Sequence, residues 1–198
     1  MPSRKLPRSF YARETLTVAR DLLGMHLVRT GVHGRQIGRI VETEAYRGPK
    51  DLAAHSSRGR TKRTEVMFGP PGHAYVYLIY GFWNCLNFVT AADGVPHAVL
   101  IRALEPVSGI ADTTHGPGLL CRALQIDRSL NGTDLTGGTL WVERPTAREY
   151  RAPRIARSRR IGVDYAGDWA KKPWRLFDSQ SPYVSTVSAS ERRRRLGS

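Results

Sequence analysis

The alternation of hydrophobic and polar positions predicts that β-strands dominate the middle of this chain. In residues 36–46, every second side chain falls on one face of a strand, which groups Ile40, Glu42, Glu44 and Tyr46. Strand-like patterns also mark residues 26–29, 73–79, 84–90, 97–104, 140–143, 174–177 and 183–187. Consecutive strands are separated by short turn signals, so we expect a mainly antiparallel sheet.

Two helices are expected beside this sheet. Residues 12–23 carry a helical apolar stripe, with Ser9 as a possible cap and Gly24 as the stop. Residues 118–126 form the second helix, and residues 47–72 read as mostly irregular. The pattern as a whole predicts an α+β fold in a single mixed domain.

Length and charge limit the possible partners. The 198 residues suit one domain, expected at residues 10–188 between basic tails at 1–9 and 189–198. Lys plus Arg number 31 against 17 Asp plus Glu, a formal net charge of +14. Such a balance favours nucleic acid as the partner over an anionic membrane surface.

The sequence lacks the usual motifs for disulfide scaffolds, metal sites and phosphate binding. Cys85 and Cys121 have neither disulfide-scaffold nor metal-ligand spacing, and the six histidines are scattered. Phosphate-cradling glycine motifs are absent from the sequence, so we expect no metal and no cofactor. The N-terminus has no leader-like apolar segment and the chain no long apolar run, so we expect a cytoplasmic protein that does not enter a membrane.

Glu44 is the candidate for chemistry. A glutamate in a strand usually faces water, and that ordinary interpretation stays open. A carboxylate beside Tyr46 in a basic protein could instead activate a water molecule as a general base. Arg102, on the strand expected at 97–104, is the natural partner that would keep Glu44 ionised.

Aromatic side chains accompany this carboxylate. Tyr46, Tyr75, Tyr77 and the loop residue His55 could stack a flipped nucleobase, although each could also be an ordinary packing residue. Tyr80 lies at a hairpin tip, where it could act as a wedge in the minor groove or pack on its own protein.

Arginines supply the expected contacts to phosphate. The segment at 151–160 holds five of them, and 58–63 forms a basic loop. Phosphate contacts position a protein on DNA without reading its sequence. The candidates are Arg58, Arg60, Arg154 and Arg157.

Several long segments resemble one known family. They are ARDLLGMHLVR, GRIVETEAYRGPKDLAAHSSRGRT, HAYVYLIYGFWNCLNFV, VLIRALEP, GPGLLCRALQI, RIGVDYAGDWAKKPWRLF and SPYVS. They closely resemble the alkyladenine (3-methyladenine, alkylpurine) DNA glycosylases over about residues 10–187, with gaps at 107–115 and 131–153. The resemblance implies a monomeric, monofunctional, metal-free enzyme built on a curved antiparallel sheet, which hydrolyses the N-glycosidic bond of damaged purines in double-stranded DNA.

The resemblance also implies residue roles. Glu44 matches the general base, and Arg102 matches the arginine that helps to hold the attacking water. Tyr46, His55 and Tyr77 match the aromatic sandwich around the flipped purine, with the His55 backbone also placed to read the base edge. Asn87 matches the side chain that discourages normal guanine, and Tyr80 matches the intercalating residue.

The chain departs from the family pattern at two places. Gly118-Leu119 stand where some members have Ser-Lys, which removes a candidate phosphate contact. Phe82 and Trp83, beside the wedge, are bulkier than or different from the residues of some members. The first departure bears on DNA affinity, and the second bears on the choice of lesion.

Two other interpretations remain. The chain could be a non-catalytic nucleic-acid-binding module that stacks bases on its tyrosines, although such a module would not need Glu44. It could also be a binding domain related to the tRNA-binding, C-terminal domain of formyltransferases, whose fold is similar but whose catalytic domain has no counterpart here.

Overall fold

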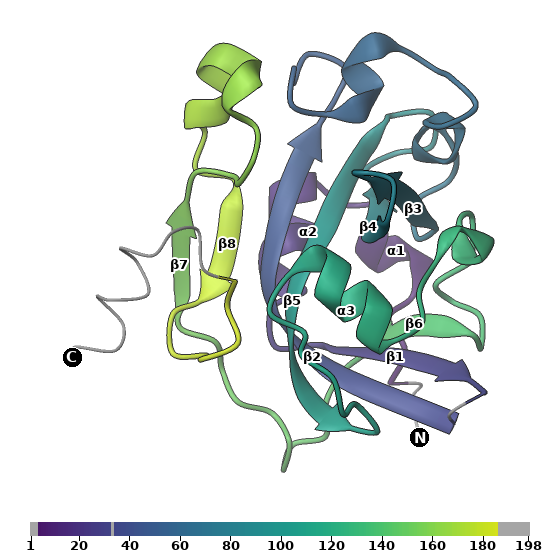
Figure 1. Cartoon of the computed structure of the whole chain (residues 1–198), viewed down its shortest axis with the longest axis vertical. Coiled ribbons are helices and arrows are strands. Elements are labelled where there is room, and N and C mark those ends of the chain that lie inside the picture. Colours follow the sequence, from purple (N-terminus) through teal and green to yellow (C-terminus); the bar gives the residue numbers. More distant parts are fainter. Residues whose placement is uncertain (1–3, 33, 186–198) are drawn as a thin grey trace.

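One curled antiparallel sheet organises the protein (Figure 1). The computed structural model describes residues 4–32 and 34–185, and within them a sheet of eight strands has the order β3-β4-β5-β2-β1-β6, with β8 beside β2 and β7 beside β8. The strands are β1 (His26–Gly31), β2 (Gly34–Arg47), β3 (Ala74–Ile79), β4 (Trp83–Thr90), β5 (His97–Ser108), β6 (Leu140–Glu143), β7 (Ile155–Ser158) and β8 (Arg175–Asp178). The expected α+β class, single domain and antiparallel pairing are confirmed.

The long strand β2 changes face part of the way along. Its pairing with β5 shifts register between Ile40 and Glu42 and again between Glu42 and Thr43, as at a β-bulge. Ile40 therefore packs in the main core together with Ala45, and not on the face that carries Tyr46. The expectation that simple alternation places Ile40 with Glu44 and Tyr46 was wrong, because the irregularity inserts a residue into the pattern.

The N-terminal helix is broken in two. In place of one helix at 12–23 with Ser9 as cap, the structure has α1 (Arg8–Tyr11) and α2 (Thr15–Asp21). The side chain of Glu14 accepts a hydrogen bond from the Thr17 N–H, so Glu14 is the cap that starts α2. The expected second helix is present as α3 (Pro117–Ala123), with its proline in the first turn.

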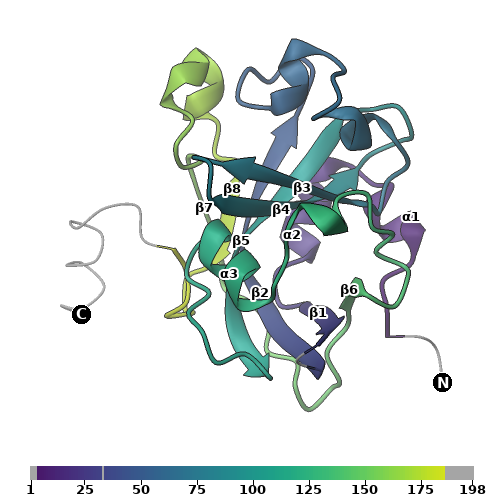
Figure 2. The same ribbon diagram turned by 45° about the vertical axis from the view of Figure 1, so that its right-hand side comes forward.

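The helices pack on the central strands. α2 contacts β2 and β5, whereas α3 contacts β4 and β5 (Figure 2). The irregular stretch 47–72 holds two 3-10 turns, η1 (His55–Arg58) and η2 (Glu65–Phe68), and later turns are η3 (Arg128–Leu130) and η4 (Asp164–Lys171). Loops around η1 and around η4 lie at the same end of the sheet, where they enclose the site described below (Figure 1).

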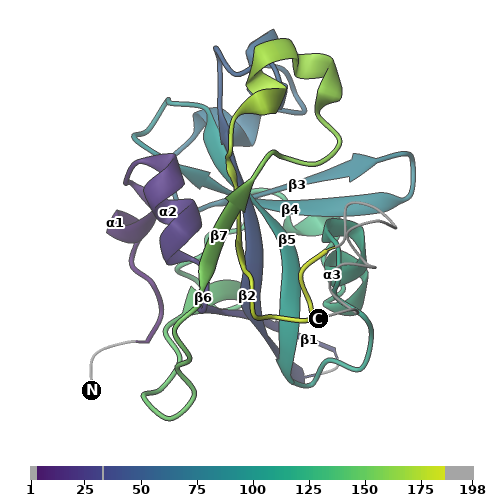
Figure 3. The same cartoon turned by 90° about the vertical axis from the view of Figure 1, so that its left-hand side faces the viewer.

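Two described stretches near the ends of the domain depart from the expected pattern. Lys5 forms a bridge with Glu143 and Leu6 is fully buried, although both fall within the expected basic tail. Residues 183–185 form no strand, while 186–187 and the expected tail at 189–198 lie outside the described residues. The basic segment at 151–160 contains β7, which pairs with β8 at the side of the sheet (Figure 3).

No helix in residues 4–32 or 34–185 combines the length and the apolar character that crossing a membrane requires.

Candidate active site

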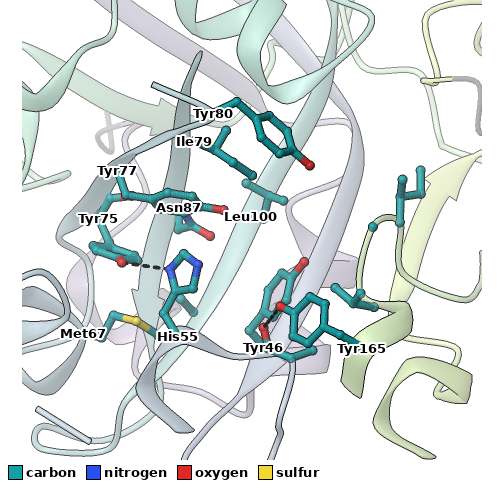
Figure 4. Close-up of a pocket in the computed structure, with 15 residues that line it drawn as sticks. Tyr46, His55, Met67, Tyr75, Tyr77, Ile79, Tyr80, Asn87, Leu100 and Tyr165 are labelled. Carbon is teal, nitrogen blue, oxygen red and sulfur yellow. Dashed lines mark hydrogen bonds between the residues drawn. The ribbon is translucent and has the colours of Figure 1, made fainter. Parts of the chain in front are cut away.

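A cavity of about 290 Å³ opens between the end of the sheet and the η4 segment (Figure 4). Its lining comes from β2, η1, η2, the β3–β4 hairpin, β5 and the segment that leads into η4. The lining residues are Tyr46, Ala53, His55, Met67, Tyr75, Tyr77, Ile79, Tyr80, Asn87, Ala98, Leu100, Ile161, Gly162, Val163 and Tyr165. The residues expected to stack a base and to read its edge therefore share one cavity.

Glu44 lies beneath this cavity and is fully buried. Its Oε2 accepts a hydrogen bond of 2.7 Å from the Tyr46 hydroxyl, and its Oε1 accepts one of 2.8 Å from the Ile161 N–H. Nη1 of Arg102 lies 3.4 Å from Oε1. The interpretation of Glu44 as a strand residue facing water is therefore wrong, because Tyr46 and the Ile161 backbone cover the carboxylate.

Arg102 belongs to a buried network of alternating charges. Its Nε donates to Oε1 of Glu42 at 3.1 Å, and the same oxygen accepts from Nε of Arg175 at 2.6 Å. The N–H of Ser185 donates to the other Glu42 oxygen. Burial lowers the pKa of Arg102, but the carboxylates of Glu44 and Glu42 raise that pKa overall, so Arg102 stays charged beside Glu44.

Aromatic rings form two walls of the cavity (Figure 4). On one side, the His55 ring meets Tyr77 edge to face with centroids 4.4 Å apart, and its Nδ1 lies 3.0 Å from the Tyr75 hydroxyl. Tyr46 and Tyr165 form the other side. Burial, and then the neighbouring Glu44, raise the pKa of Tyr46, so its phenol stays protonated and donates to the carboxylate.

Two further expected residues lie at the same cavity. Asn87 is buried on β4, and its Nδ2 donates to the Tyr75 carbonyl at 3.2 Å. Tyr80 stands at the hairpin tip with 79% of its surface exposed and a positive φ of 53°. Its neighbour Gly81 also has a positive φ, as the tight turn between β3 and β4 requires.

The expected phosphate-binding arginines lie on the surface. Arg58, Arg60, Arg154 and Arg157 are all exposed. Arg60 makes an ion pair of 3.3 Å with Glu65, whose side chain is also exposed, so screening by water leaves that pair weak.

One arginine of this run was misread from the sequence. Arg160 is buried and paired with Asp51, whereas Arg151 pairs with Glu105 but keeps 57% of its side chain exposed. Arg160 therefore stabilises the fold instead of presenting charge to a phosphate. Whether an arginine supports the fold or contacts phosphate depends on partners that are distant along the chain. A run of like charges does not indicate where those partners are.

The segment from Ile161 to Tyr165 is the part of the site that sequence reasoning missed. Its backbone donates to Glu44, and Tyr165, 71% exposed, stands at the cavity mouth. It joins the site only because β7 and β8 bring residues 160–165 against β2. Among the described residues, no group of three or more His, Cys, Asp or Glu side chains is placed to hold a metal ion.

Comparisons with known proteins point to one family. Residues 9–182 match the family model described as methylpurine-DNA glycosylase. A relative from Legionella pneumophila (strain Corby) is 52% identical over 92% of this chain and 98% of its own length. Others, from Anaeromyxobacter sp. (strain Fw109-5) and Methanocella arvoryzae, are 56% and 54% identical over 91% of this chain and 92% and 95% of their own lengths. All three carry the name "Putative 3-methyladenine DNA glycosylase".

The chain belongs to the methylpurine-DNA glycosylase family.

The two departures from the pattern of this family are in contact with each other. A Cβ added to Gly118 would meet the Trp83 ring at 2.6 Å, which real contacts do not show. The guanidinium of Arg122 lies 5.5 Å from the centroid of the same ring. A glycine at 118 therefore accommodates the bulky indole, and α3 supports the base of the hairpin that carries Tyr80.

We predict that acid destabilises this glycosylase fold through His55. Burial, followed by the charges of Arg63 and Arg58, lowers the pKa of His55 to about 4. The unfolded chain, with an ordinary histidine pKa, takes up this proton at higher pH, so the free energy of unfolding should fall as the pH drops from about 6.5 to about 4. After allowance for partial exposure, we expect a loss of about 2 kcal/mol from this residue.

Urea denaturation at pH 7 and at pH 4.5 measures this loss. His55→Gln cannot titrate and should show a smaller fall than the wild type. The exposed His115→Gln is the matched control and should keep the wild-type fall. Equal falls for wild type and His55→Gln would contradict the prediction.

Proposed function

We propose that the protein is a DNA glycosylase that takes alkylated purines out of double-stranded DNA and hydrolyses the N-glycosidic bond, leaving an abasic site for base excision repair. The observation that carries the proposal is a buried carboxylate, paired with an arginine and hydrogen-bonded to Tyr46 and Ile161, which both line an aromatic cavity. The formal net charge of +14 favours binding to the phosphates of the DNA backbone.

The cavity suits a base that has left the helix. The extruded purine would stack between Tyr46 and the pair formed by His55 and Tyr77, with its edge towards Asn87. An amide at this position would clash with the exocyclic amine of normal guanine. Extrusion costs less for a poorly paired base, which adds to the selectivity.

Glu44 would activate the attacking water. A carboxylate has about four lone-pair positions, and two of those on Glu44 accept hydrogen bonds, from the Tyr46 hydroxyl and the Ile161 N–H. A further position can accept a hydrogen bond from a water, with the Arg102 guanidinium, 3.4 Å from Oε1, beside it to help hold that water. Glu44 then takes the proton as water attacks C1′, and its charge stabilises the oxocarbenium-like transition state.

The leaving group needs little help. Alkylation at N3 or N7 gives the purine a positive charge, which the electrons of the breaking glycosidic bond neutralise. A neutral lesion such as hypoxanthine would instead need a proton at N7. The fastest release is therefore expected from cationic methylpurines.

We further propose that the protein acts as a monomer in the cytoplasm.

Release of methylated bases tests the proposed function. The protein is incubated with DNA that carries 7-methylguanine and 3-methyladenine, and hot alkali then converts abasic sites to strand breaks. We expect breaks that depend on the protein and on methylation. Binding to this DNA without any breaks would favour a non-catalytic binding module instead.

Tyr80 gives a prediction about the duplex. Tyr80→Ala removes the side chain that would fill the gap left by the extruded nucleotide, and one stacking contact contributes about 1–3 kcal/mol. Single-turnover excision from a duplex should therefore fall at least about fivefold, whereas excision from single-stranded DNA should change little. Tyr150→Ala, another exposed tyrosine outside the cavity lining, is the control. Equal losses on both substrates would show that Tyr80 does not act as a wedge.

A further inference from the structure

Arg160 is an unusually constrained arginine next to the candidate active site. Its side chain and that of Asp51 are both fully buried, and its two terminal nitrogens donate to the two carboxylate oxygens at 2.5 and 2.8 Å. The same nitrogens donate to the carbonyls of Ala45 at 3.0 Å and Trp169 at 3.1 Å. The guanidinium is thus held in one plane by four acceptors.

This plane lies against Tyr46. The guanidinium carbon is 4.7 Å from the centroid of the Tyr46 ring and 5.1 Å from that of Trp174. Tyr46 lines the cavity, whereas neither Arg160 nor Trp174 does. The arginine therefore supports the ring from behind and leaves its other face to the cavity.

Arg160 also fixes the backbone next to it. Ile161 follows directly in the chain, and its N–H donates to Oε1 of Glu44 at 2.8 Å. The carbonyl that Arg160 holds at Ala45 lies between Glu44 and Tyr46 in sequence. One side chain thus links the carboxylate, the ring above it and the backbone donor that orients the carboxylate.

Asp51 neutralises the charge of Arg160 behind the Tyr46 ring. A bare guanidinium behind Tyr46 would repel a cationic purine stacked on the front of the same ring. The bidentate carboxylate makes the support neutral while keeping the guanidinium flat.

We propose that Arg160, neutralised by Asp51, is a positioning residue that holds the Tyr46 ring in register with Glu44, so that a cationic purine can stack and react. The inference rests on the proposed function. It assigns to Arg160 a role through Tyr46 and not a contact with DNA.

A double-mutant cycle between positions 160 and 46 tests the coupling. Arg160→Lys keeps the charge beside Asp51 but loses the flat fork, and Arg159→Lys, at an exposed neighbouring position, is the matched control. Single-turnover release of 7-methylguanine is measured for each variant with Tyr46 and with Tyr46→Ala. Far-UV circular dichroism and urea denaturation show that each variant is folded.

We expect Arg160→Lys to slow release about tenfold when Tyr46 is present and by no more than about twofold when Tyr46 is already Ala. Arg159→Lys should have no effect in either background. Equal slowing in both backgrounds would mean that Arg160 does not act through the Tyr46 ring, and no slowing would mean that it has no role; either result overturns the inference. If Arg160→Lys does not fold, Asp51→Asn combined with Arg160→Gln, which removes both charges, goes through the same cycle with the same criteria.

Base release by the wild type distinguishes a failure of the inference about Arg160 from a failure of the proposed function. Release of base by the wild type without coupling between positions 160 and 46 overturns the inference and leaves the proposed function intact. No release by the wild type overturns the proposed function, and the inference with it.

Discussion

Glu44→Gln should slow base release by at least about a thousandfold while leaving binding to damaged or abasic DNA nearly unchanged. The amide has almost the size of the carboxylate but can neither take a proton from water nor stabilise a positive sugar. Its nitrogen would also face a hydrogen-bond donor, since the Tyr46 hydroxyl and the Ile161 N–H donate to the two native oxygens. The expected loss therefore lies in the chemical step.

Single-turnover excision from a methylated duplex measures the rate, and a gel-shift titration with abasic DNA measures the affinity. Glu65→Gln is the matched control, since this carboxylate is exposed on η2 and pairs only weakly with Arg60. It should leave the rate unchanged. Normal turnover by Glu44→Gln would remove Glu44 from the role of general base and, with it, the mechanism proposed for this site.

Raising the salt concentration should weaken non-specific DNA binding by about a thousandfold between 50 and 200 mM, if about six phosphates are contacted. The physical reason is the release of condensed counterions when arginine and lysine side chains neutralise phosphates. Each contact contributes about −0.9 to the slope of log affinity against log salt concentration. A chain with a formal net charge of +14 can supply that many contacts.

Single substitutions identify which arginines take part. Arg58→Gln, Arg60→Gln, Arg154→Gln and Arg157→Gln should each make the slope shallower by about 0.9, measured by fluorescence anisotropy with an undamaged duplex. Arg148→Gln is the control, because Arg148 is exposed but lies in the turns after β6, outside the cavity lining. A flat salt response of the wild type would mean that the basic surface does not bind DNA, and an unchanged slope would exclude the substituted residue.

Local patterns predicted the secondary structure well where pairing is regular. The strand expected at 140–143 is β6 at those bounds, and β3, β4 and β5 contain almost all of the residues expected for them. Antiparallel neighbours joined by short turns need no information from distant segments. Prediction failed at the start of the helix expected at 12–23, which begins only at Thr15, after the cap formed by Glu14, and ends at Asp21.

Ion pairs in the site were predictable only in part. Glu44 and Arg102 meet as expected because β2 and β5 pair directly, with Glu44 opposite Leu100. Arg160 and Asp51 are 109 positions apart and meet only once β7 and β8 have joined β2. From the sequence, Arg160 could not be told from the exposed arginines beside it.

The sequence by itself determined the class of the sheet, the charge that favours DNA and the motifs that place the chain in its family. Residue type and local spacing carry those properties, which need no knowledge of which segments touch. Only the tertiary structure decided that Glu44 is buried under Tyr46, that β2 switches face beyond Ile40, and that Arg160 supports a ring instead of a phosphate. Each of these depends on contacts between segments that are distant in sequence. The surroundings that decide whether a charged side chain is buried or exposed form only when the chain has folded.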